Sequence, residues 1–79
     1  MDTAEAVALS FDIVDRIKPL MAGRPGEVQG AVIAQLLAMW VAGHYLNGEA
    51  IMEEVLEHHI AHVRTLIPIE VDALRQMRS

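Results

Sequence analysis

Three side chains in the second half of the chain have the types and spacing of metal ligands. His58 and His62 are four residues apart, so on a helix both imidazoles project from the same side. This is the spacing at which one helix offers two histidines to a zinc ion, and Glu54, one turn earlier, adds a carboxylate. The pattern predicts a metal site at Glu54, His58 and His62, and with it a metal-binding protein as one alternative function.

A catalytic metal site is not supported by the same run. Zinc proteases place a glutamate directly after their first histidine to activate water, whereas this chain has His59 there. Di-iron bundles need Glu-x-x-His, a pair that the sequence lacks. The structural alternative is a surface pair between Glu54 and His58, with His59 as a hydrogen-bonded core or interface residue on the apolar side of the helix.

No other segment indicates catalysis. Ser10 and Thr65 have no base at motif spacing, and the run from Gly23 to Gly26 lacks the Gly-Lys-Ser/Thr ending of a phosphate loop. His44 and Tyr45 follow an apolar helix, where we expect them to close its end and cover Trp40. The sequence therefore predicts no catalytic residue, no cofactor and no enzymatic activity.

Proline and glycine divide the chain into segments of helical length and period. We expect helices over about 3–22, 26–43 and 48–67, capped at Asp2 and Asn47, with a kink or an early end at Pro19. Pro68 should end the last of these helices. Residues 69–79 then form either a short fourth helix or a frayed end.

The second of these helices has no polar face. Between Val28 and Gly43 the only polar side chains are Gln29 and Gln35. A helix that is apolar all round must be buried all round, and a short chain has little protein with which to surround it. A second copy of the chain is the simplest partner that could bury this helix.

The same helix carries two kinds of packing surface. Small residues recur at every fourth position and form a shallow groove, while larger residues fill most of the remaining circumference. One surface serves the subunit core and the other an interface, and the sequence leaves open which is which. The predicted interface residues are Gly30, Ala34, Ala38, Ala42, Leu37 and Trp40.

Composition also favours association. The chain has 79 residues, and 53% of them are hydrophobic even before glycine is counted. Ordinary soluble domains contain roughly 45–50% apolar residues with glycine included. Domains this small are only marginally stable alone, and the absence of cysteine excludes disulfides. We therefore expect a homo-oligomer, with a dimer favoured.

Charge limits the classes of partner. The 11 acidic and 6 basic residues give a net charge of −5, and the basic residues never cluster, so nucleic-acid binding is not expected. Residues 28–46 carry no formal charge, but two glutamines, His44, two glycines and acidic flanks argue against a membrane span. The N-terminus does not resemble a signal peptide, which favours a cytoplasmic protein.

These patterns together predict an all-α protein. The expected architecture is a small antiparallel three-helix bundle, with or without a short C-terminal fourth helix, packed as a homo-oligomer. The leading functional hypothesis is a small interaction or assembly protein that binds itself and a protein partner. Besides metal binding, the sequence leaves open a small regulator that acts through protein contacts.

Overall fold

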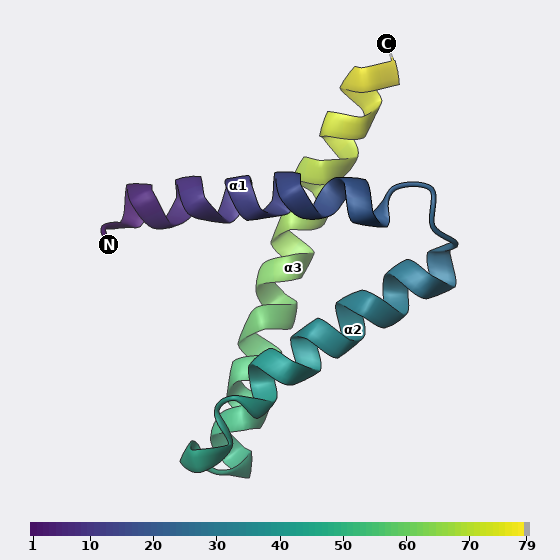
Figure 1. Cartoon of the computed structure of the whole chain (residues 1–79). Helices are drawn as coiled ribbons and strands as arrows, with labels where there is room; N and C mark the ends of the chain where they lie inside the picture. The colour runs from purple at the N-terminus through teal and green to yellow at the C-terminus, as the bar shows by residue number, and fades with distance from the viewer. Residues whose placement is uncertain (79) are drawn as a thin grey trace. The chain divides into compact units, whose positions relative to one another are not determined.

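The computed structural model describes residues 1–78, and every regular element in them is helical. In chain order these elements are α1 (Thr3–Met21), α2 (Gly26–Ala42), the 3₁₀ helix η1 (Tyr45–Asn47) and α3 (Glu49–Arg78) (Figure 1). The all-α class is therefore confirmed for the described residues. Antiparallel bundle packing of the helices stays a prediction.

Helix α1 begins where its cap was predicted. The Asp2 carboxylate accepts a hydrogen bond from the backbone N–H of Glu5 at 2.8 Å, which satisfies one of the free donors of the first turn. Pro19 does not end the helix, which continues to Met21. The N–H of Ala22 then bonds to the carbonyl of Lys18, and Gly23 turns the chain with a positive φ of 75°.

Helix α2 starts directly after Pro25. The Pro25 carbonyl accepts from the N–H groups of Val28 and Gln29, at 3.0 and 3.1 Å, and so forms the first helical bonds. The helix ends at Ala42, where the N–H of Gly43 bonds to the carbonyl of Met39. Both ends agree with the prediction to within one residue, the usual uncertainty of helix boundaries.

The connection from α2 to α3 corrects one predicted cap. Asn47 does not cap α3 but ends η1, and Gly48 takes the cap position, with its carbonyl accepting from the N–H of Met52 at 3.1 Å. Gly48 has φ 93° and ψ 165°, a conformation that side chains with a Cβ rarely adopt. Glycine is therefore required at the start of α3 by the backbone.

Gly48→Ala is expected to lower the free energy of unfolding by about 1–3 kcal/mol, the cost of holding a residue with a Cβ at a φ and ψ that essentially only glycine populates. Gly30→Ala is the matched control, because Gly30 lies inside α2 and an added Cβ there meets no atom within 4 Å. The control should gain about 0.5–1 kcal/mol, since alanine is the better helix former. Urea unfolding followed by circular dichroism measures both, and equal effects of the two changes would contradict the strain at Gly48.

The predicted break at Pro68 is wrong, because α3 runs through it as one helix to Arg78. Proline lacks an N–H, so Pro68 costs the helix one bond, to the carbonyl of Arg64. That loss is local, and the residues after Pro68 are mostly strong helix formers, with Arg75 and Arg78 placed to suit the negative end of the dipole. The segment 69–78 is thus neither a separate helix nor a frayed end, and Ser79 lies outside the described residues.

The chain divides into two compact units, residues 1–35 and residues 36–79. The division falls between Gln35 and Leu36, inside the continuous helix α2, so it is not a linker. In the first unit the Gln29 side-chain amide donates to the carbonyl of Met21 at 2.7 Å, which joins α2 to the end of α1. The prediction of a single domain stays a prediction.

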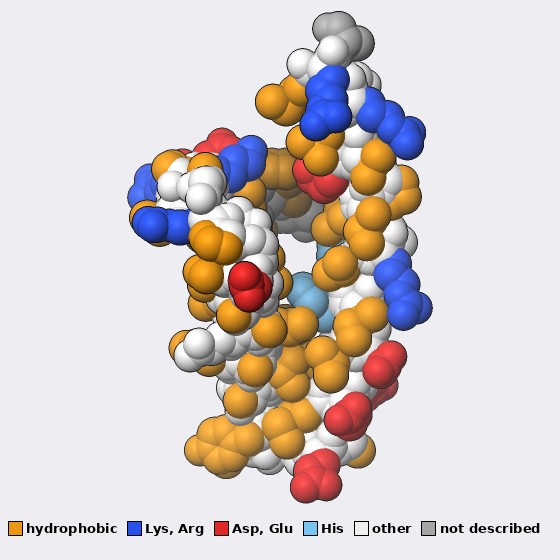
Figure 2. All heavy atoms as spheres, turned by 90° about the vertical axis from the view of Figure 1, so that its right-hand side faces the viewer, with side chains coloured by type: hydrophobic (Ala, Val, Ile, Leu, Met, Phe, Trp, Pro, Cys, Tyr) orange, Lys and Arg blue, Asp and Glu red, His pale blue; other side chains and the backbone are white. Residues whose placement is uncertain are grey.

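None of the described residues is buried. The half-buried ones lie mainly in the second unit, on the end of α2 and the first half of α3. They are Met21, Gln29, Leu37, Val41, His44, Met52, Val55, Leu56, His59 and Ile60. Hydrophobic side chains accordingly lie open over much of the face drawn in the space-filling view (Figure 2). A single copy of this chain leaves its apolar surface largely in water.

Candidate functional site

A cluster of aromatic rings in the second unit brings α2 and α3 together. The Trp40 ring lies against His59 of α3, with 4.8 Å between ring centroids and 49° between planes. The His44 ring meets the same indole edge-on, at 5.4 Å and 80°. The edge-on pair has a geometry that aromatic rings prefer, and the Trp40–His59 pair is tilted between the stacked and edge-on arrangements. The Trp40 ring therefore contacts α3 from the end of α2.

His44 also closes the end of α2. Its Nδ1 lies 3.0 Å from the carbonyl oxygen of Trp40. A carbonyl oxygen only accepts, so Nδ1 carries the hydrogen and Nε2 is left as the acceptor of the neutral ring. This bond satisfies a carbonyl at the helix C-terminus and confirms that His44 closes the helix end and contacts Trp40.

An open hollow of about 340 Å³ lies beside this cluster in the second unit. It is lined by Trp40, His44, Glu54, Val55 and His58. An indole and a valine supply its apolar part, while one carboxylate and two imidazoles supply hydrogen-bonding groups. The hollow therefore places hydrogen-bonding groups beside an apolar surface.

Only two of the three predicted metal ligands lie at the same hollow. Glu54 and His58 line the hollow together, but His62 does not, and both histidines are exposed on α3. Within residues 1–78, no three His, Asp or Glu side chains are placed to hold one metal ion. Metal binding at Glu54, His58 and His62 stays a prediction, and no contact in the described chain adds to it.

The predicted interface residues fall into two groups. Gly30, Ala34, Ala38 and Ala42 are all exposed along α2. Leu37 is half-buried, and Trp40 is 49% exposed with its ring against the two imidazoles. Leu37 and Trp40 are thus partly covered by other residues of the second unit. The four small residues are exposed in the single chain.

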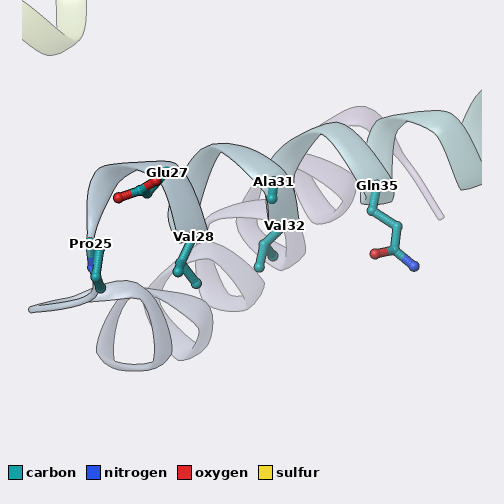
Figure 3. A pocket seen from close by; sticks show the side chains of 6 residues that line it. All are labelled: Pro25, Glu27, Val28, Ala31, Val32 and Gln35. Carbon is teal, nitrogen blue, oxygen red and sulfur yellow. The ribbon is translucent and has the colours of Figure 1, made fainter.

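A second open hollow, of about 400 Å³, lies along the first half of α2 in the first unit. Pro25, Glu27, Val28, Ala31, Val32 and Gln35 line it. Val28, Val32 and Gln35 project from the same side of the helix (Figure 3). The hollow is therefore an uncovered face of α2 that is mostly apolar, with the Glu27 carboxylate near its start and the Gln35 amide at its far end.

The sequence did not identify the role of His59. Its place on the apolar side of the helix was evident from spacing, but its contact with Trp40 joins residues that are far apart in the chain. The Trp40–His44 pair had a local signal, because residues four apart are neighbours on a helix. The described ion pairs, in contrast, are all exposed and local, joining Asp12 to Arg16, Asp15 to Lys18 and Asp72 to Arg75.

Within the described residues, no helix combines the length and the apolar character needed to cross a membrane. The described residues include the hollow beside Trp40, the hollow along the first half of α2, and exposed apolar side chains on all three α-helices. Comparisons of the chain with protein-family models, with curated proteins and with solved structures find no match.

Proposed function

We propose that this chain is a non-enzymatic assembly module, which acts by associating with a second copy of itself and binding a protein partner. The observation that carries the proposal is the uncovered state of α2. Its large apolar side chains remain open to water in the single chain, including Ile33 at 58%, Leu36 at 52% and Met39 at 62%. No charged side chain lies between Glu27 and Glu49 to make such a surface soluble.

The other helices support the same proposal. Phe11 and Leu20 of α1 are 67% and 69% exposed, and Leu74 of α3 is 61% exposed. Moving a large apolar side chain fully out of water stabilises by roughly 1.5–3 kcal/mol, so covering even the exposed part of several such residues drives association strongly. We also propose that the three helices pack as an antiparallel bundle, because short connections make consecutive helices neighbours.

The chemistry of the side chains also supports a binding role over a catalytic one. The groups gathered around Trp40 are a carboxylate and imidazoles on an open surface, without the hydroxyl or thiol of a nucleophile beside them. The basic residues are scattered along the chain, which suits a protein partner better than a nucleic acid. A protein surface with apolar groups is the class of partner that this chain fits.

Size-exclusion chromatography with multi-angle light scattering tests self-association. At micromolar concentration we expect a mass near twice the 8.7 kDa of one chain, with the helical circular dichroism of a folded protein. Dilution should shift the mass toward that of one chain and lower the melting temperature, because association and stability are linked by mass action. A well-folded species with the mass of a single chain at all concentrations would overturn the proposal.

A further inference from the structure

The hollow beside Trp40 lies wholly within the second unit and combines an indole with a carboxylate. Trp40 is the only tryptophan of the chain, and it is 49% exposed. Glu54 lines the same hollow from α3 and is also exposed. An indole attracts a cation more strongly than other aromatic rings do, and a carboxylate attracts it by charge. Together the two groups have the chemistry of a site for an organic cation.

The Glu54 carboxylate has no cation of its own. Within residues 1–78, no ion pair or side-chain hydrogen bond joins Glu54 to another side chain, although His58 lies one turn further along α3. An ionised carboxylate accepts hydrogen bonds at both of its oxygens. Glu54 is therefore available to pair with a group that another molecule brings to the hollow.

His44 adds a second acceptor to the hollow beside Trp40. Its Nδ1–H is used by the Trp40 carbonyl, so Nε2 is the ring nitrogen left to accept from a ligand. His44 lines the hollow together with Glu54 and Trp40. The hollow thus offers hydrogen-bond acceptors and a flat apolar ring, which are the groups that a cationic donor needs.

Among biological cations, a guanidinium matches these groups best. It is planar, so it stacks on an aromatic ring, and it carries five N–H donors in a fixed plane. A lysine ammonium has the same charge but no flat face to place on an indole. The side chain that this hollow fits is therefore that of arginine.

The surface around the hollow is acidic. Between Arg24 and Arg64 the chain contains no lysine or arginine. The first half of α3 instead carries four exposed carboxylates, and acidic side chains gather at this lower end of the molecule in Figure 2. They are Glu49, Glu53, Glu54 and Glu57. A field of this sign steers basic segments toward the hollow and repels acidic ones, because charge complementarity governs encounter.

The size of the hollow suits one side chain presented by a larger partner. Its volume is about 340 Å³, and it is open to solvent. Pockets for free small molecules hold about 300–1,000 Å³ and bury most of the ligand surface. An open hollow at the lower end of that range does not enclose a free ligand. A side chain on a protein segment needs no such enclosure, since the rest of the segment makes further contacts.

We propose that the hollow beside Trp40 binds an arginine side chain from a basic segment of a protein partner, with the guanidinium stacked on the indole and bonded to the Glu54 carboxylate. This inference rests on the proposed binding of a protein partner and names the chemistry by which that partner is recognised. It does not depend on self-association.

Titration with matched peptides tests the site, and the single indole of the chain reports on it directly. The probe is a short glycine–serine peptide that carries arginines, and its control carries citrulline, which keeps the shape and removes the charge. The buffer is at pH 8, so that neutral imidazoles do not repel a cation, and at physiological ionic strength. The arginine peptide should shift the Trp40 indole N–H resonance and bind at least about tenfold more tightly than the citrulline peptide. A lysine peptide should bind more weakly than the arginine peptide.

Glu54→Gln tests the carboxylate, with Glu70→Gln as its matched control. Both glutamates are exposed on α3 and both changes remove one charge, but Glu70 does not line the hollow. Glu54→Gln should weaken binding of the arginine peptide at least about tenfold, because a charge-assisted hydrogen bond is lost. Glu70→Gln should change it by less than about twofold, since salt screens charges that lie beyond about 8 Å. Circular dichroism reports the folding of each variant.

The outcomes separate this site from other occupants and from self-association. Equal binding of the arginine and citrulline peptides, or equal losses for the two glutamate variants, would overturn the site. Tighter binding of a matched phenylalanine peptide would assign the hollow to an apolar partner and overturn it as well. By light scattering on the same samples, a dimer that binds no arginine peptide would overturn this inference and leave self-association intact. A folded single chain that binds the arginine peptide with the expected selectivity would support this inference and overturn self-association.

Discussion

Ala38→Glu is expected to dissociate the assembly, with Kd for self-association rising at least about 100-fold, or about 2.7 kcal/mol. Ala38 is exposed in the single chain and lies on α2, the helix whose uncovered state carries the proposed self-association. In a two-fold dimer that pairs through this side of α2, one substitution places two carboxylates in an apolar contact, and α2 has no lysine or arginine to pair with them. Sedimentation equilibrium or light scattering over a dilution series measures the change.

The control for this prediction is Glu57→Gln. Glu57 is an exposed residue on the charged side of α3, away from the apolar side that carries His59. The change removes one charge and keeps the shape, so we expect self-association to be unaffected or slightly stronger because less charge repels. Glutamate is itself a good helix former, so Ala38→Glu should keep the helical circular dichroism at high concentration. Equal Kd values for wild type and Ala38→Glu would exclude the side of α2 that carries Ala38 as the interface.

Trp40→Ala is expected to lower the free energy of unfolding by about 2 kcal/mol. The indole is half covered, and full burial of a large side chain is worth about 1.5–3 kcal/mol. Its two ring contacts, to His44 and His59, add about 0.5–1.5 kcal/mol each in favourable geometry. Because Trp40 joins α2 to α3, its loss should weaken the whole second unit and lower the cooperativity of melting.

Tyr45→Ala is the matched control for Trp40. Tyr45 is an aromatic residue in η1 of the same unit, but it is 66% exposed. Surface substitutions of this kind usually change stability by less than about 0.5 kcal/mol. Urea unfolding of both variants by circular dichroism, at one protomer concentration, separates the two effects. A loss for Trp40→Ala no larger than that for Tyr45→Ala would show that the ring cluster does not hold α2 to α3.

Local rules were sufficient for the helices and most of their ends. The Asp2 cap, the start of α2 after Pro25 and the closure of α2 by His44 each depend on residues within four positions of one another. Such contacts follow from helical geometry, which the sequence encodes directly. Pro68 was misjudged because a proline removes only one hydrogen bond, and the favourable residues that follow it outweigh that loss.

Contacts between distant segments could not be predicted. Nothing in the spacing indicates that Gln29 reaches the Met21 carbonyl, or that Trp40 meets His59 and leaves His62 outside the hollow. Helical periodicity assigns a side chain to a direction around its own axis but does not say which other helix lies in that direction. The predicted metal ligands share a side of α3 for this local reason, yet the described chain brings no further helix's ligand to them.

The sequence by itself determined an all-helical chain with a second helix free of charge, because hydrophobic period, proline, glycine and caps act over a few residues. Only the tertiary structure decided which sides of that helix are used. It placed the Gln29 amide against the Met21 carbonyl and the Trp40 ring against His59, and it left most other residues of α2 exposed. Packing depends on which segments meet in space, and that choice is made by the whole chain rather than by any stretch of it.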